Sequence, residues 1–188
     1  MTYVELIVVL SIFAVMASIV IFNYGAFQAK IDIKNLSSDI ALKIIETQKN
    51  SISGKLPVQT PTPDPTKWKP SYGTYFSGST TFTKFVDLNQ SAIYDSNNLS
   101  CGGTGECLEQ ITLTQGNTIS HLDVFYQDGT NAPLSDLTIT FFRPSSGALI
   151  RSSSPLVSPV SYVKITIASP TSATATIKVY PSGRVQID

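Results

Sequence analysis

The sequence predicts an α+β protein in which a long N-terminal α-helix packs on a C-terminal antiparallel β-sheet domain. Three observations predict this class. Residues 6–29 carry no charged side chain, residues 33–44 repeat apolar residues at helical spacing, and residues 72–188 alternate between short apolar runs and turns. We therefore expect a hydrophobic helix half at 1–29 and a single head domain at 30–188, which is an ordinary domain size.

The apolar stretch 6–29 can be interpreted in three ways. As a helix its 24 residues would reach roughly 36 Å, enough to cross the hydrocarbon core of a membrane. A cleaved signal peptide is disfavoured because no basic residue precedes Lys30. A plain membrane anchor leaves Glu5 unexplained, since a carboxylate beside an apolar helix costs several kcal/mol unless it is paired.

The third interpretation rests on a resemblance. Met1, the acid Glu5, about twenty apolar residues and an amphipathic continuation resemble the processed N-terminus of a type IV pilin or pseudopilin, over residues 1–53. The resemblance implies a leader already removed by a prepilin peptidase, an N-methylated Met1, and a platform protein and an assembly ATPase as partners. It also implies a homo-oligomeric helical filament, in which Glu5 pairs with the α-amino group of Met1 on a neighbouring subunit.

The helix is expected to continue as an amphipathic half over residues 30–53. Ser53, Gly54 and Pro57 then supply a stop signal, which gives a helix of about 50 residues. The Pro-rich residues 57–72 predict an extended connection to the body.

A β-rich region of meandering antiparallel strands is expected at 72–188. Its last strands, within LTITFFRPSSGALI and then VKITIASPTSATATIKVYPSGRVQI, resemble the C-terminal strands of the FimT/GspH-like proteins of the same family. The expected strand segments are YGTYFS, TFTKFVDL, LEQITLT, TISHLDVFYQ, LTITFFR, GALIR, VSYVKITIA, SATATIKVY and GRVQI.

The two cysteines, Cys101 and Cys107, enclose a short Gly-rich turn. A disulfide between them is expected, consistent with export to an oxidising compartment. A metal pair is the alternative, but His121 is the only histidine that could complete it.

Residues 87–95 have a degraded calcium-loop spacing. Asp87, Asn89, Ser91 and Asp95 would supply side-chain oxygens, and Ile93 a backbone carbonyl. The other interpretation is an Asx turn, in which Asp87 and Asn89 accept hydrogen bonds from their own backbone. We favour the turn, and apart from this weak calcium loop no cofactor is expected.

Charge is distributed unevenly along the chain. Residues 85–142 hold seven acids and no Lys or Arg, whereas residues 143–188 hold five bases and one acid. These stretches are either solvated strand faces or complementary faces of neighbouring subunits. Nucleic acid is not an expected partner, because the bases are sparse and lack interleaved aromatic residues in a dense patch.

The sequence does not predict an enzyme. His121 has Asp123 nearby, but no nucleophile motif accompanies them. The predicted function is a structural subunit of a type IV pilus, held in the inner membrane as a monomer and then built into an extracellular filament for adhesion or twitching motility. The alternatives are a pseudopilin of a type II secretion system and a single-pass, membrane-anchored β-domain that acts as an adhesin or binding module.

Overall fold

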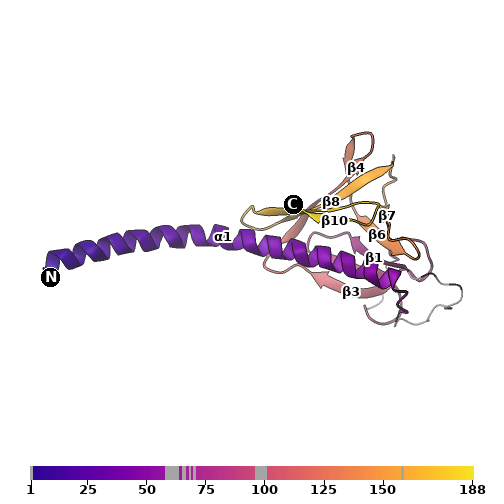
Figure 1. Ribbon diagram of the computed structural model, residues 1–188, viewed down its shortest axis with the longest axis horizontal. Coiled ribbons are helices and arrows are strands. Elements are labelled where there is room, and N and C mark those ends of the chain that lie inside the picture. Colours follow the sequence, from indigo (N-terminus) through magenta and orange to yellow (C-terminus); the bar gives the residue numbers. More distant parts are fainter. Residues whose placement is uncertain are drawn as a thin grey trace.

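The structure is a computed structural model that describes residues 2–57, 64, 67, 69, 71–95, 101–157 and 159–188. In these residues the chain forms one α-helix and ten strands (Figure 1). The elements are α1 (Tyr3–Ile52), β1 (Ser71–Phe76), β2 (Thr81–Val86), β3 (Cys107–Thr112), β4 (Thr118–Tyr126), β5 (Asn131–Pro133), β6 (Leu137–Phe142), β7 (Ala148–Arg151), β8 (Val160–Ala168), β9 (Thr174–Val179) and β10 (Val185–Ile187). Most of the predicted Pro-rich connection lies outside the described residues.

Helix α1 is 50 residues long and has a defined signal at each end. At its start, Thr2 is the N-cap and forms a capping box with Glu5. At its end, Ser53 is the C-cap and Gly54 adopts a φ of 69°, the left-handed conformation that commonly terminates a helix. The helix therefore ends where the sequence predicts that it ends.

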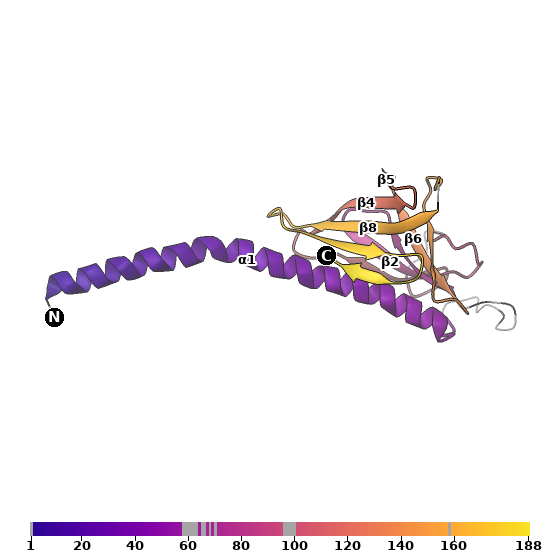
Figure 2. The same cartoon turned by 45° about the horizontal axis from the view of Figure 1, so that its top comes forward.

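The two halves of α1 have different surroundings. The N-terminal half projects away from the strands, and the C-terminal half lies along them (Figures 1 and 2). The C-terminal half buries one stripe that contacts β1, β6, β9 and β10. The stripe repeats at intervals of three or four residues, as one face of a helix does. Its members are Ile33, Ser37, Ile40, Ile44, Thr47 and Ser51.

The strands form two antiparallel sheets of five strands each. The first sheet has the order β3-β2-β1-β6-β7 and the second has the order β10-β9-β8-β4-β5. One hydrophobic core contains buried side chains from α1 and from both sheets, such as Ile40, Phe82 and Ile165. The body is therefore held together by contacts between elements that are far apart in the sequence.

The fold class predicted from the sequence is wrong in two respects. The strands were expected to follow one another as a meander in an antiparallel β-sheet domain. Instead, β1 pairs with β6 and β4 pairs with β8, so the strands are divided between two sheets. A membrane-spanning half of the helix was also expected. Among the residues that the structure describes, no helix has the length and apolar character needed to cross a membrane. The predicted pilin-like class is accordingly corrected to two packed antiparallel sheets that carry α1.

The strand error has a physical origin. Alternation of apolar and polar residues identifies a strand, but it does not identify the strand's partner. Partner choice here follows from long-range packing on the shared core. The short strand β5 was not predicted at all, because its three residues include a proline and show no alternation.

Candidate assembly surface

The N-terminal half of α1 exposes apolar side chains around its circumference. Within the described residues, nothing in the chain covers them. A helix that is hydrophobic on all sides is normally buried against something else. The exposed fractions of the large apolar residues here range from 48% to 80%, at Tyr3, Val4, Leu6, Ile7, Val8, Val9, Leu10, Ile12, Phe13, Val15, Met16, Ile19, Ile21, Tyr24 and Phe27.

Glu5 caps the helix that it begins. Its Oε2 accepts hydrogen bonds from the backbone N–H of Thr2 at 2.9 Å and from the Thr2 hydroxyl at 3.3 Å, while its own N–H donates to Thr2 Oγ1 at 3.4 Å. A carboxylate in the first turn also interacts favourably with the helix dipole. Thr2-x-x-Glu5 is the capping-box pattern, which the sequence interpretation overlooked. Met1, the predicted partner of Glu5, lies outside the described residues.

A second exposed apolar surface lies on the C-terminal half of α1, and the sequence interpretation missed it. We call it the outer stripe, and it consists of Ile31, Leu42, Ile45 and Ile52, which are 38% to 63% exposed. At about 100° per residue these four lie within about 80° of one another, and about 140° around the helix from the buried stripe. The four side chains share one face of the helix without repeating at successive turns, because Lys34, Ser38 and Lys49 lie between them on that face.

Charged side chains fix α1 against the first sheet. Lys84 on β2 is almost buried and forms ion pairs with Glu46 at 2.9 Å and with Glu109 at 3.4 Å. Lys43 contacts the same Glu109 carboxylate at 3.3 Å. The hydrogen bond from Lys84 lowers the pKa of the Glu46 carboxyl below its ordinary value. This network joins α1 to β2 and β3 and helps to set the direction in which the helix leaves the body.

Gln48 fixes α1 against turns of both sheets. Its side-chain amide donates to the carbonyl of Ser146 at 2.8 Å and to the carbonyl of Gly183 at 3.2 Å. Three residues further on, Ser51 donates to the carbonyl of Phe141 at 2.8 Å. Because these acceptors belong to the β6–β7 turn, the β9–β10 turn and β6, the helix contacts both sheets through polar as well as apolar groups.

The predicted calcium loop is an Asx-type turn. The Asp87 carboxylate accepts hydrogen bonds from the N–H groups of Ser91 and Ala92, and Asn89 Oδ1 accepts from the same Ser91 N–H. Asn89 donates to Asp95, so these oxygen atoms already have partners within the protein. The remaining predicted ligand, the carbonyl of Ile93, accepts from the Ser91 hydroxyl. Among the described residues, no group of three or more His, Cys, Asp or Glu side chains is arranged to hold a metal.

This loop covers the outer face of the first sheet. Tyr94 packs its ring against Phe85 and Tyr75, with ring centroids 5.3 and 5.1 Å apart. The buried Glu106 carboxylate holds the loop in place by accepting from the N–H groups of Leu88 and Asp95. Burial raises the pKa values of both Asp87 and Glu106 above their ordinary range.

The predicted disulfide is confirmed. Cys101 and Cys107 are bonded, with their Cα atoms 4.6 Å apart. Cys107 begins β3, and its neighbour Glu106 is the residue that holds the loop of residues 87–95, which we call the covering loop. The disulfide therefore restrains the segment that presents the Glu106 carboxylate.

The bases of the second sheet have acidic partners within the chain. Lys164 pairs with Asp123 on the neighbouring strand at 3.3 Å, and Lys178 pairs with Asp188. The sequence left open whether the C-terminal bases are solvated or face acids of a neighbouring subunit. For Lys164, the register of β4 against β8 brings an acid, Asp123, alongside it within one molecule.

Aromatic residues also lie beside these bases, which the sequence interpretation did not foresee. Lys164 lies over the ring of Phe125, Lys178 over Tyr162, and Arg184 over Tyr180 at 3.9 Å from its centroid. The rings of Phe125 and Tyr162 stack on each other, with centroids 4.6 Å apart. The faces of these rings are covered by one another and by cations. They therefore offer little surface on which the base of a nucleotide could stack.

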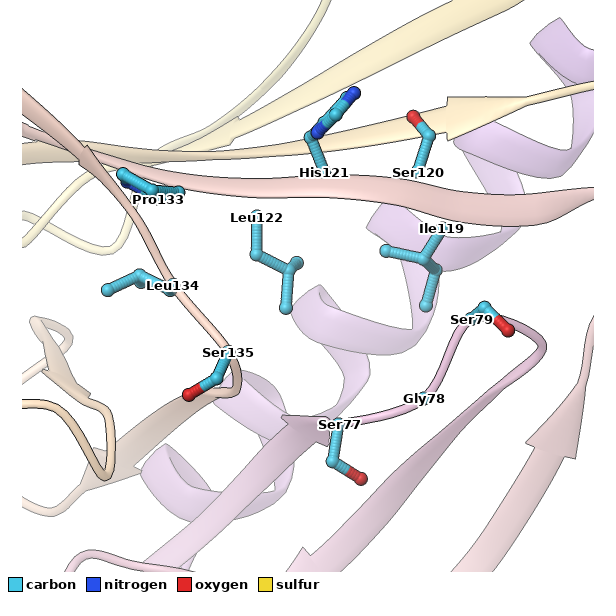
Figure 3. Close-up of a pocket in the computed structure, with 10 residues that line it drawn as sticks. All are labelled: Ser77, Gly78, Ser79, Ile119, Ser120, His121, Leu122, Pro133, Leu134 and Ser135. Atoms are coloured by element: carbon cyan, nitrogen blue, oxygen red, sulfur yellow. The ribbon is translucent and has the colours of Figure 1, made fainter.

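A small cavity lies between the two sheets. It has a volume of about 240 Å³ and lies between β4, the β1–β2 turn and the segment after β5. Ile119 and Leu122 point into it, whereas His121 points away on the other side of β4 (Figure 3). Its polar lining consists of His121, whose ring lies on the other side of β4, and of serines such as Ser77 and Ser135.

Comparison with known proteins identifies no relative: no family model, no curated protein and no solved structure matches this chain.

Proposed function

We propose that this chain is a structural subunit that polymerises through α1 into an extracellular filament, in the role of a type IV pilus subunit. The observation that carries the proposal is the exposed N-terminal half of α1. Its large apolar side chains have no cover within the described chain, and they project from a body with its own complete core. Burial of such side chains is worth about 1.5 to 3 kcal/mol each, which is a strong drive toward association.

Two further observations support this proposal. The disulfide between Cys101 and Cys107 is typical of proteins that function in an oxidising compartment. The body also fixes the direction of α1 through Lys84 and Gln48, which suits a helix that must meet neighbours in a defined geometry. The predicted inner-membrane stage, the assembly machinery and the uses in adhesion or twitching motility stay predictions.

The alternatives differ in what they ask of α1. A pseudopilin would polymerise through the same surface, so it shares the test given below. A membrane-anchored β-domain would use α1 only as a lipid-facing anchor, and would be monomeric once it is surrounded by detergent. Self-association of the full chain is therefore the property that separates the two classes.

The experiment introduces one charge into the exposed half of α1. Full-length protein is purified in detergent, the detergent is diluted below its micellar concentration, and polymer is measured by sedimentation and electron microscopy. Phe13→Asp is the test variant, because Phe13 is 70% exposed and lies on the projecting half. Gln127→Asp is the control, because Gln127 is exposed on the β4–β5 turn.

We expect wild type and Gln127→Asp to form ordered fibres, and Phe13→Asp to lose at least about tenfold in polymer because an unpaired charge is costly in a buried interface. Thermal unfolding of the body should be the same in all three proteins. Fibres as numerous in Phe13→Asp as in wild type would overturn the proposal. So would a wild-type chain that stays monomeric or forms only amorphous aggregate.

A further inference from the structure

We propose that the disulfide between Cys101 and Cys107 is a redox switch for the covering loop, which is closed while the disulfide is intact and opens when the disulfide is reduced to two thiols. The disulfide acts through Glu106, whose carboxylate holds both ends of the loop. This switch lies in the body and goes beyond the proposed assembly through α1, on which it does not depend.

The Glu106 carboxylate holds the covering loop at two points. Its Oε1 accepts a hydrogen bond from the N–H of Leu88 at 3.0 Å, and its Oε2 accepts one from the N–H of Asp95 at 2.9 Å. Hydrogen bonds to an ionised acceptor are stronger than those between neutral groups. Leu88 and Asp95 lie at opposite ends of the loop, so the position of one side chain decides whether both ends are held.

The position of Glu106 depends in turn on the segment that the disulfide closes. Glu106 lies outside β3, directly before Cys107. The closed segment contains Gly102 and Gly105, whose φ angles are 84° and 100°. Glycine has the greatest conformational freedom of all residues, and a covalent link between the ends of a segment removes much of that freedom. Reduction therefore restores mobility to the residues that present the carboxylate.

The covering loop is itself strained, which favours opening once its ends are released. Gln90 and Ala92 both have a φ of 62°, in the left-handed region that residues with a Cβ rarely adopt. Such conformations persist where the surrounding contacts impose them. The Asp87 carboxylate supplies part of this restraint by accepting from the N–H groups of Ser91 and Ala92. Glu106 supplies the restraint at the ends.

The closed loop buries an aromatic surface of the first sheet. Phe85 on β2 is fully buried, and the ring of Tyr94 in the loop packs against it. The loop also contacts β6, since Thr140 Oγ1 donates to the carbonyl of Ala92 at 3.1 Å. Opening would separate Tyr94 from Phe85 and expose both rings to solvent.

The switching reaction is an exchange with an external thiol. Cys101 is exposed, whereas Cys107 is only 6% exposed, so the thiolate approaches from the side of Cys101. Its attack on the Cys101 sulfur forms a mixed disulfide, and Cys107 leaves as a thiolate that takes up a proton. A second external thiol then displaces Cys101, which yields two protein thiols and one external disulfide. The reverse exchange with an external disulfide closes the loop again.

The redox state of the compartment would therefore set the state of the loop. Thiols stay reduced in the cytosol and are oxidised in extracellular and periplasmic compartments. The body would carry an open covering loop under reducing conditions and complete the first sheet's cover only after oxidation.

The test measures amide hydrogen exchange in full-length protein in detergent, with and without excess dithiothreitol. We expect the amides of Leu88 and Asp95 to exchange at least about tenfold faster in the reduced protein. The double variant Cys101→Ser and Cys107→Ser should show the same fast exchange without reductant. The amide of Thr130 is the internal control, because it is bonded to the Asp128 carboxylate on the β4–β5 turn at 2.9 Å. It should change by less than about twofold.

A second pair of variants tests whether the disulfide acts through Glu106. Glu106→Ala keeps the disulfide and lacks the carboxylate, so its loop should be open in the oxidised protein, and dithiothreitol should change its exchange by less than about twofold. Glu109→Ala is the matched control, because Glu109 lies on β3 and pairs with Lys43 and Lys84. It should keep the full response to reduction. Chymotrypsin cleavage after Tyr94 should increase in parallel with exchange.

Three outcomes would overturn the switch. The first is equal protection of Leu88 and Asp95 in the oxidised and reduced proteins, once mass spectrometry has shown that both thiols are free. The second is a loss of protection on reduction that is as large in β8 as in the covering loop, which would make the disulfide a general support of the body. The third is a full response to dithiothreitol in Glu106→Ala, which would show that the disulfide does not act through this carboxylate.

Discussion

The two halves of α1 share one backbone conformation for different reasons. The C-terminal half is selected by packing, since its buried stripe meets both sheets and its polar side chains reach backbone carbonyls of the body. The N-terminal half makes no such contacts among the described residues, and its side chains are apolar on every side. A helix can therefore continue for several turns past the domain that supports it, provided that something outside the chain covers the extension.

Because of this difference, the stability of the body and the association of copies depend on different segments of α1. A substitution in the packed half should act on the free energy of unfolding of the body. A substitution in the projecting half should act on association and leave the unfolding of the body unchanged. Each prediction below tests that separation, from the largest expected effect to the smallest.

The sharpest comparison is between two isoleucines of the same helix. Ile44 is fully buried, so Ile44→Ala should lower the free energy of unfolding by about 2 to 5 kcal/mol, through lost burial and an unfilled cavity. Ile12 is 52% exposed on the projecting half, so Ile12→Ala should change the free energy of unfolding by less than about 0.5 kcal/mol. Chemical denaturation of both variants in detergent measures the difference. Equal losses would mean that the projecting half is part of the folded core.

A second comparison tests how tightly the packed half is held. Gly183 has a φ of 85°, and a Cβ there would collide with the Ser146 carbonyl and the Gln48 amide. Gly183→Ala should therefore cost about 2 to 4 kcal/mol, from backbone strain together with displacement of Gln48. Gly129 has the same φ of 85° with open space around it, so Gly129→Ala carries the backbone strain alone and should cost only about 1 to 2 kcal/mol. Similar melting temperatures for the two variants would argue that Gln48 does not fix the helix.

The third prediction concerns pH and is confined to the body. Burial raises the pKa values of Asp87 and Glu106, whose ordinary values are about 4. Between those values and the raised ones the folded state binds more protons than the unfolded state, so their contribution to stability is fully present below about pH 4 and is lost as the pH rises.

Above pH 4 the free energy of unfolding should therefore decrease less steeply with pH in Glu106→Gln than in wild type. The substitution should also weaken the covering loop at every pH. Urea denaturation of wild type and variant at several pH values between 4 and 7 measures this change of slope. A difference between the two proteins that stays constant with pH would contradict the raised pKa. Association through the projecting half should follow a separate pH profile, since neither carboxylate lies on α1.

The smallest effect is expected at the start of α1. Glu5→Ala should weaken the first turn of the helix by about 0.5 to 1 kcal/mol, because it removes half of the capping box. Glu5→Gln should retain most of this local stability. Amide hydrogen exchange at residues 5–8 in detergent reports the difference, and equal exchange in both variants would show that the cap contributes nothing. Unfolding of the body should not respond to either change.

The sequence was informative wherever local patterns decide the structure. The end of α1 at Ser53 and Gly54, the span of β8, and the bond between Cys101 and Cys107 all follow from short-range signals. Sheet membership did not follow, because the pairing of β1 with β6 depends on packing between residues more than sixty positions apart. The outer stripe was missed for a different reason, since one apolar periodicity on a helix had already been assigned to the core.

The attachment of α1 to the body also has a mechanical consequence. A pull along the projecting half would be carried by a buried stripe and by hydrogen bonds from Gln48 and Ser51 that are spread along the same axis. Such contacts share the load and must fail together, rather than opening one at a time from an end. Because their acceptors belong to both sheets, the tension is passed into the whole body. The joint between helix and body is thus built to resist shear.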